Sequence, residues 1–213
     1  KKAFADRVRE VEPNLFVLHP LAIPLYGKPW IRTLNKALLK WQVRRAMKRL
    51  GFKKPVNWTS IPTAVVVAGQ LGEETLIYHC VDEYAAFSDM PSESLLAMEA
   101  ELCAKADLVV VSAEPLRVSK SKHNPSTVLV RHGVDFDHFR KALDPSTTIP
   151  AETAELPHPI IGFFGLLADW VDVDMMAHVA EKFPHGSLVI LGKVDTDVSK
   201  LEALPNVHML GRK

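Results

Sequence analysis

Apolar runs alternate with helical segments through the middle of the chain. Runs at 75–80 (TLIYHC), 107–113 (DLVVVSA) and the start of 126–139 (STVLVRHGVDFDHF) predict buried strands, since parallel strands are usually covered on both faces. The segment 95–106 (LLAMEAELCAKA) has helical composition and lies between the first two runs. This order predicts right-handed βαβ units and a parallel sheet.

A second alternation begins near residue 160. It predicts strands at 160–165, 187–192 and 206–211, and helices at 171–183 and 197–204. The stretch 142–159 holds four prolines and many small polar residues, which is typical of a linker. We therefore expect an α/β domain over 1–145, a linker over 146–158 and the start of a second α/β domain over 159–213.

The first part of the chain is less regular. The pattern predicts a strand leading into a proline-bounded loop at 14–24, a helix at 30–50 ended by Gly51, and a short strand at 55–62. The segment 63–72 (TAVVVAGQLG) fits either a helix or a second strand. No hydrophobic strand or glycine-rich turn opens the chain, and the last strand is followed at once by its end, so we expect a chain cut at both ends.

Composition is that of an ordinary globular protein, with 47% hydrophobic and 24% charged residues. Cys80 and Cys103 lie in apolar stretches and form no CxxC pattern, which predicts buried free thiols in a reducing compartment. No apolar run approaches the roughly 18 residues that span a bilayer, and no signal peptide opens the chain. The expected location is cytoplasmic.

Charge is strongly asymmetric. No acidic residue occurs between Glu12 and Glu73, where the basic residues are Lys28, Arg32, Lys36, Lys40, Arg44, Arg45, Lys48, Arg49, Lys53 and Lys54. Aromatic residues do not interleave with them as a nucleic-acid stacking platform would, so no nucleic-acid partner is expected. The segment 28–54 fits an anionic membrane surface, at about 1 kcal/mol per basic residue, and a peripheral position on the inner membrane face.

The helical pattern of that segment is imperfect. Ile31, Leu34, Leu38 and Trp41 share one side at 100° per residue, whereas Val43, Met47 and Leu50 lie almost opposite. A core helix with a solvated basic face is therefore an equal alternative.

Six segments in order carry a family resemblance. IYHCVDEYAAF, AELCAKADLVVVSAEPL, VLVRHGVDFDHF, PIIGFFGLLADWVD, LVILGKVD and LPNVHMLGRK make residues 73–213 similar to group 1 (GT4-like) retaining glycosyltransferases, nearest to bacterial enzymes of surface-polysaccharide assembly. The resemblance implies the GT-B architecture of two Rossmann-like parallel-sheet units, the second incomplete here. It also implies a hexosyltransferase type of activity, with a nucleotide-sugar donor and a polysaccharide or lipid-linked acceptor, although a cut chain could be inactive.

On the acceptor side, the resemblance implies catalytic roles for His79, Asp82 and Glu83. His79 ends a strand where several family members carry a histidine near the transferred sugar, and the two acids are placed to orient sugar hydroxyls. Ligands of open parallel sheets bind beyond the carboxyl ends of the strands, where these residues fall. Other interpretations stay open: His79 could bond a backbone carbonyl, and Asp82 could cap the following helical turn.

On the donor side, the resemblance implies that strand-end turns face the nucleotide. The residues are Gly165, Gly192, Lys193, Gly211 and Lys213, joined by Arg131 and His132 from the RHGVD turn. Glycine lets a backbone approach a phosphate and lysine adds charge. Asp169 and Asp172 stand where family members often have Arg or Lys, and Asp135 could be a helix cap.

No cofactor or metal is expected. The histidines lack metal-site spacing, and the family's mechanism lets the leaving diphosphate deprotonate the acceptor hydroxyl without a protein nucleophile. Glu93 and Glu101 match the family's E-x7-E spacing but lie on a helix of the first domain, which predicts a solvated face. Two alternatives are a noncatalytic nucleotide- or partner-binding module of the same fold and a nucleotide-sugar epimerase.

Overall fold

The computed structural model describes residues 7–23, 29–86 and 92–213, and the chain divides into two compact units. The first unit is Lys1–Gly133 and the second is Val134–Lys213. The segment 134–158, which includes the expected linker, therefore groups with the second unit.

The first unit opens with an antiparallel hairpin of β1 (Val8–Glu12) and β2 (Leu15–Leu18), which turns at Asn14 with φ of 64°. The strand expected at the start of 14–24 is β2, and the described residues after it, 19–23, form no regular element. Its partner β1 was not expected from the sequence, because VREVE carries charges and is largely exposed.

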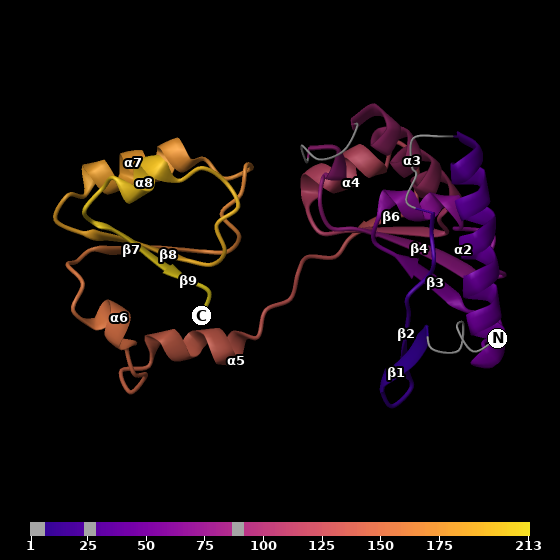
Figure 1. The fold of residues 1–213 in the computed structure, drawn as a ribbon, viewed down its shortest axis with the longest axis horizontal. Coiled ribbons are helices and arrows are strands. Elements are labelled where there is room, and N and C mark those ends of the chain that lie inside the picture. Colours follow the sequence, from indigo (N-terminus) through magenta and orange to yellow (C-terminus); the bar gives the residue numbers. More distant parts are fainter. Residues whose placement is uncertain (1–6, 24–28, 87–91) are drawn as a thin grey trace. The chain divides into compact units, whose positions relative to one another are not determined.

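A four-stranded parallel sheet forms the centre of the first unit, in the order β3-β4-β5-β6 (Figure 1). Its strands are β3 (Val56–Thr59), β4 (Thr75–Cys80), β5 (Leu108–Val111) and β6 (Thr127–Leu129). The connections contain η1 (Pro62–Val66), η2 (Tyr84–Ala86), α3 (Ser92–Lys105) and α4 (Glu114–Lys120). The ambiguous segment 63–72 therefore contributes a 3₁₀ helix and no strand.

The core of this unit lies between the sheet and the helices α3 and α4. Alternate residues of β4 point into it, because successive side chains of a strand face opposite ways. The core residues are Val65, Ala68, Leu76, Tyr78, Cys80, Leu102, Cys103, Ala106, Val109, Val111 and Leu116. Both cysteines are buried and free, as expected.

Helix α2 (Pro29–Arg49) buries a partly polar side and exposes a partly apolar one. Ile31 and Gln42 are each 1% exposed, whereas Trp30 is 64% and Trp41 53% exposed. The Gln42 amide accepts from the Leu21 N–H at 2.8 Å and donates to the Leu21 carbonyl at 2.9 Å, so its burial leaves neither group unpaired. Within the described residues, no helix combines the length and apolar content needed to cross a membrane.

The second unit holds a three-stranded parallel sheet in the order β7-β8-β9. Its elements are α5 (Phe136–Phe139), η3 (Arg140–Leu143), α6 (Ala151–Ala154), β7 (Ile160–Phe164), α7 (Val173–Lys182), β8 (Ser187–Leu191), α8 (Ser199–Glu202) and β9 (Val207–Gly211). Helices α7 and α8 cover one face of this sheet and α6 lies on the other side (Figure 1). The expected α/β class with two parallel-sheet units is confirmed.

Candidate functional site

The carboxyl ends of β4, β5 and β6 meet at one edge of the first sheet. Cys80 is paired with Val111, and Val111 with Leu129, so the residues that follow these strands share an edge. The Ser112 hydroxyl joins two of the strand ends by donating to the Val81 carbonyl at 2.8 Å. The edge therefore gathers the predicted residues of this unit.

His79 lies on the sheet face opposite the helices. It is half-buried, and its ring meets the ring of Trp58 edge-on, with 5.5 Å between centroids and an interplanar angle of 81°. Within the described chain the imidazole makes no hydrogen bond, so the carbonyl contact considered from the sequence does not occur there. Its role at the site stays a prediction.

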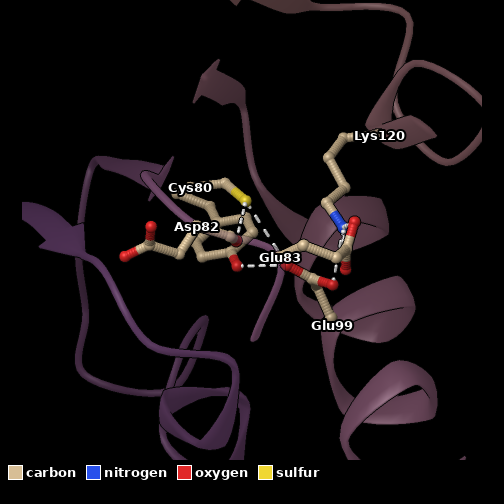
Figure 2. A network of polar contacts seen from close by, with 6 residues as sticks. Cys80, Asp82, Glu83, Glu99 and Lys120 are labelled. Carbon is tan, nitrogen blue, oxygen red and sulfur yellow. Dashed lines mark hydrogen bonds and ion pairs between the residues drawn. The ribbon is translucent and has the colours of Figure 1, made fainter. Parts of the chain in front are cut away.

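Asp82 and Glu83 are adjacent in sequence but diverge in space. The Glu83 carboxylate accepts hydrogen bonds from the Lys120 ammonium at 3.0 and 3.1 Å. The Asp82 carboxylate points away from that pair (Figure 2). Among the described residues, the Asp82 side chain has no hydrogen-bond or ion-pair partner, so it does not cap the η2 turn. The two acids are therefore not equivalent ligands for a substrate.

A buried polar network surrounds the Lys120 ammonium. Lys120 also donates to Glu99 of α3 at 2.8 Å, and these side chains are only 3% and 4% exposed. Glu99 accepts in turn from the Tyr78 hydroxyl at 2.6 Å and from the Cys80 thiol at 3.5 Å. Burial of charges is costly unless they are paired and hydrogen-bonded, a condition that this network meets.

The network shifts the pKa values of its members. Burial and the hydrogen bond to Glu99 raise the pKa of Tyr78, which keeps its hydroxyl a donor. Burial raises the pKa of the Cys80 thiol to about 12. Burial alone would lower the pKa of Lys120, but hydrogen bonds to Glu99 and Glu83 raise it, so the ammonium stays charged.

Sequence reasoning missed Glu99 and Lys120, although a signal for Glu99 exists. Leu95, Leu102, Cys103 and Ala106 define the buried stripe of α3, and Glu99 occupies the same stripe because it lies four residues from both Leu95 and Cys103. An acid on the core side of a helix requires a buried partner. Lys120 could not be chosen as that partner, since nothing in the sequence distinguishes it from nearby lysines.

Other predicted residues of the first unit lie on the surface. Arg131 and His132 follow β6 and are exposed. Glu93 and Glu101 are exposed on α3, where Glu101 pairs with Lys105 at 2.5 Å, as expected for a solvated face.

At the second sheet, the strand-end glycines lie against one another. The Gly165 N–H donates to the Leu191 carbonyl at 2.9 Å, and the Gly192 N–H donates to the Gly211 carbonyl at 2.8 Å. A Cβ on Gly192 would lie 1.8 Å from the Gly165 carbonyl oxygen, a distance that no side chain tolerates. The glycines therefore permit close contact between backbones, and the N–H groups of Gly165 and Gly192 are used within the protein.

The two predicted lysines of this unit are half-exposed and paired. Lys193 meets Asp195 at 3.0 Å, and Lys213 meets Glu152 at 2.9 Å. Both pairs are accessible to solvent, so an anion could compete for either ammonium group.

Asp135, considered as a possible cap, acts as one, and Asp172, for which no cap was expected, also caps a helix. Asp172 begins α7 by accepting from the Met175 N–H at 2.8 Å, and Asp135 accepts from the His138 N–H at 2.9 Å. Within the described part of the chain, no three His, Cys, Asp or Glu side chains are grouped so as to hold a metal ion.

Comparison with known proteins gives one informative result. No family model matches the chain, and no curated protein matches it. Among solved structures, the chain is similar to Staphylococcus aureus TarM (G117R mutant) in complex with fondaparinux, alpha-GlcNAc-glycerol and UDP, with a TM-score of 0.53 and 12% identity, covering 82% of this chain and 36% of the TarM chain. This likeness shows a shared fold, and the chain spans about a third of the TarM chain that it matches.

Proposed function

We propose that this protein is a glycosyltransferase that moves a sugar from a nucleotide-sugar to a hydroxyl acceptor. The observation that carries the proposal is the fold likeness to TarM, which covers 82% of this chain. UDP and a GlcNAc glycoside, both bound in that structure, are the types of product that such a transfer releases. The finer assignment to the group 1 (GT4-like) retaining class rests on the ordered sequence segments.

The arrangement of the first unit supports a role on the acceptor side. Asp82 is exposed at the carboxyl edge of β4, with no partner among the described residues, and a carboxylate there is suited to accept hydrogen bonds from sugar hydroxyls. His79 lies on β4, three residues before Asp82. We assign Asp82 and His79 as the residues nearest the transferred sugar.

The arrangement of the second unit supports a role on the donor side. Lys193 and Lys213 follow the neighbouring strands β8 and β9, close in sequence to Gly192 and Gly211. Phosphate charge would attract both ammonium groups, with Asp195 and Glu152 as the partners to be displaced. Arg131 and His132 stay proposed contributors to anion binding. The proposed chemistry uses electrostatic stabilisation of the leaving diphosphate and no resident metal or cofactor.

The test is nucleotide binding followed by hydrogen exchange. UDP, GDP, ADP and TDP, with their common sugars, are titrated while the unfolding temperature is followed. Saturation at 100 times the dissociation constant stabilises a fold by about 2.7 kcal/mol. We expect one base to stabilise the protein and to protect residues 192–195 and 211–213 from exchange.

Matched variants sharpen this test. Lys193→Ala should weaken binding, whereas Lys182→Ala should not, because Lys182 is the last residue of α7 and so precedes the amino end of β8. If no nucleotide binds, or if Lys182→Ala weakens binding as much as Lys193→Ala, the donor assignment is wrong. Transfer to an acceptor separates the proposed enzyme from a noncatalytic module, and an epimer formed without acceptor would identify an epimerase.

The exposed side of α2 supports a membrane-associated acceptor. Trp30, Leu34 and Trp41 are exposed, and their spacings of four and seven residues place them on one side of the helix with Arg44 and Lys48. Aromatic and basic side chains together favour an anionic lipid interface. We propose peripheral binding through the described part of 28–54 and a lipid-linked or polysaccharide acceptor; Lys28 lies outside the described residues.

Vesicle sedimentation tests the membrane proposal. Replacing Arg44, Arg45, Lys48 and Arg49 by glutamine should abolish binding to anionic vesicles. Removal of four charges elsewhere, at Lys122, Arg140, Lys141 and Lys182, serves as the control. Equal sedimentation of the two variants would contradict the proposal.

A further inference from the structure

We propose that Lys120 is a positioning residue, which with Glu99 holds Glu83 so that the turn after β4 presents Asp82 and not Glu83 to the substrate. The inference rests on the proposed function and changes the roles of the two acids at the site. Its evidence is the juxtaposition of three charged side chains from three elements (Figure 2).

The donor capacity of Lys120 is fully used. An ammonium group carries three N–H donors. The Lys120 ammonium contacts one oxygen of Glu99 at 2.8 Å and both oxygens of Glu83 at 3.0 and 3.1 Å. It has no donor left for a ligand, which argues against direct contact with the substrate.

The position of Glu99 explains why this lysine is held. Glu99 is 3% exposed and also accepts from the Tyr78 hydroxyl at 2.6 Å. Each of the two buried charges offsets the cost of burying the other, because their side chains are paired at 2.8 Å. The pair is therefore a fixed anchor, and the half-exposed Glu83 carboxylate is the part that joins the turn to it.

The rest of the turn is fixed on both sides of Asp82. The Ser112 hydroxyl donates to the Val81 carbonyl at 2.8 Å, and the Tyr84 hydroxyl donates to the Ser60 carbonyl at 2.6 Å. The Cys80 thiol contacts the Asp82 carbonyl at 3.3 Å, so the backbone at Asp82 is held while its side chain is exposed. A substrate hydroxyl could recruit Glu83 only by breaking its bonds to Lys120, whereas Asp82 is available without rearrangement.

The first experiment measures the turn without any assumption about activity. Hydrogen exchange of the peptide that contains residues 81–86 is compared among the wild type, Glu83→Ala, Glu83→Gln and Glu101→Gln. We expect Glu83→Ala to accelerate exchange there by about tenfold, as for loss of a charge-assisted hydrogen bond, and Glu83→Gln by less. Glu101→Gln removes an exposed acid from α3 and should leave the exchange of residues 81–86 unchanged. In every variant, the exchange of residues 160–213 should also stay unchanged.

The second experiment uses turnover of the nucleotide-sugar that the wild type accepts. We expect Asp82→Asn to lose more than about a hundredfold in kcat, and Glu83→Gln to lose about tenfold with an unchanged pH profile. If Glu83 acted on the substrate through its own charge, replacing it by a neutral residue would alter the pH dependence of kcat. The neutral glutamine partly rescues a positioning role, so Glu83→Gln should exceed Glu83→Ala in kcat.

Two results would overturn the inference. One is unchanged exchange of residues 81–86 in Glu83→Ala. The other is a Glu83→Gln variant that loses as much kcat as Asp82→Asn or loses a limb of the pH profile. If the wild type turns over no nucleotide-sugar, the proposed function fails, and the exchange comparison alone decides whether Lys120 and Glu83 hold the turn.

Discussion

The two parallel sheets end in carboxyl edges that are built in opposite ways. In the first unit, side chains determine the edge: Glu99 and Lys120 are buried and charged, and they fix the turn through Glu83. In the second unit, backbones determine it, because Gly165 and Gly192 touch directly and the charged side chains remain half-exposed. The first edge therefore depends on charge pairing and the second on the absence of a side chain.

The difference also explains how each edge can hold a ligand. At the second edge, Lys193 and Lys213 are half-exposed beside the glycine contacts, which suits an anion that brings its own charge. The buried pairing of the first unit leaves Asp82 as an oriented acceptor, which suits neutral hydroxyls.

The largest effect is expected at the buried pair. Lys120→Met keeps the length of the side chain but leaves Glu99 buried without its cation, and should lower the free energy of unfolding by about 4 kcal/mol. Urea unfolding at pH 7, followed by tryptophan fluorescence, measures it. The double variant Lys120→Met with Glu99→Leu should lose less free energy of unfolding than Lys120→Met alone, because it buries no unpaired charge. A loss below about 1 kcal/mol for the single variant would contradict the buried-pair account.

The second effect is expected at the glycine contact. Gly192→Ala places a Cβ 1.8 Å from the Gly165 oxygen, at a backbone φ of 137°, so the strand ends must separate. A loss of about 2 to 3 kcal/mol is expected, confined to residues 160–213 in hydrogen exchange. Gly162→Ala is the matched control, because no atom lies within 4 Å of a Cβ there. Equal stability of the two variants would show that the contact is dispensable.

A third prediction concerns Glu73, a carboxylate held, among the described residues, by hydrogen bonds and not by a cation. Glu73 accepts from the N–H groups of Gly69 at 2.6 Å and Leu71 at 2.7 Å and from Asn57 at 3.1 Å. Burial alone would raise the pKa of Glu73, but these hydrogen bonds lower it below 4.5. Because the folded pKa is the lower one, the stabilisation is present above the unfolded pKa and is lost as pH falls through the folded pKa.

Glu73→Gln should therefore cost about 1 to 2 kcal/mol at pH 7 and progressively less as the pH falls below the ordinary glutamate range. Urea unfolding of the wild type and the variant across this pH range measures the difference. Glu74→Gln, which removes an exposed neighbouring acid, is the control. A pH-independent difference would mean that the Glu73 charge does not matter.

The smallest effect is expected at the exposed pairs. Lys213→Ala removes the contact with Glu152, in which both side chains are about half-exposed, and should leave the unfolding midpoint unchanged. The same variant should weaken nucleotide binding if the donor assignment is right. A large loss of stability would show that this pair contributes to the fold of the second unit.

The sequence predicted what depends on local pattern. Apolar β-branched runs identified β4, β5, β7 and β8, and their alternation with helices identified two parallel sheets. The pattern failed at β1, because a hairpin strand with charged, exposed residues has no apolar signature. It predicted the helix α2, observed at Pro29–Arg49, but not the burial of Gln42, because the bonds of Gln42 to Leu21 depend on tertiary structure.

At the candidate site, the same limit applies. Strand-end positions of His79, Asp82 and the glycines follow from the strand pattern. The divergence of Asp82 and Glu83 does not, because it depends on Lys120, which is brought to Glu83 across 37 residues by the fold. The roles of these residues in ligand binding stay predictions.

The sheet of the second unit continues past its glycines. Leu167 and Val194 form a parallel bridge, with the Leu167 N–H bonded to the Lys193 carbonyl at 2.9 Å and the Asp195 N–H bonded to the Leu167 carbonyl at 2.7 Å. Backbone hydrogen bonds thus connect the turns after β7 and β8 beyond the strand ends. A ligand that shifts the backbone at Lys193 would therefore also shift the backbone at Leu167, in the turn that follows Gly165.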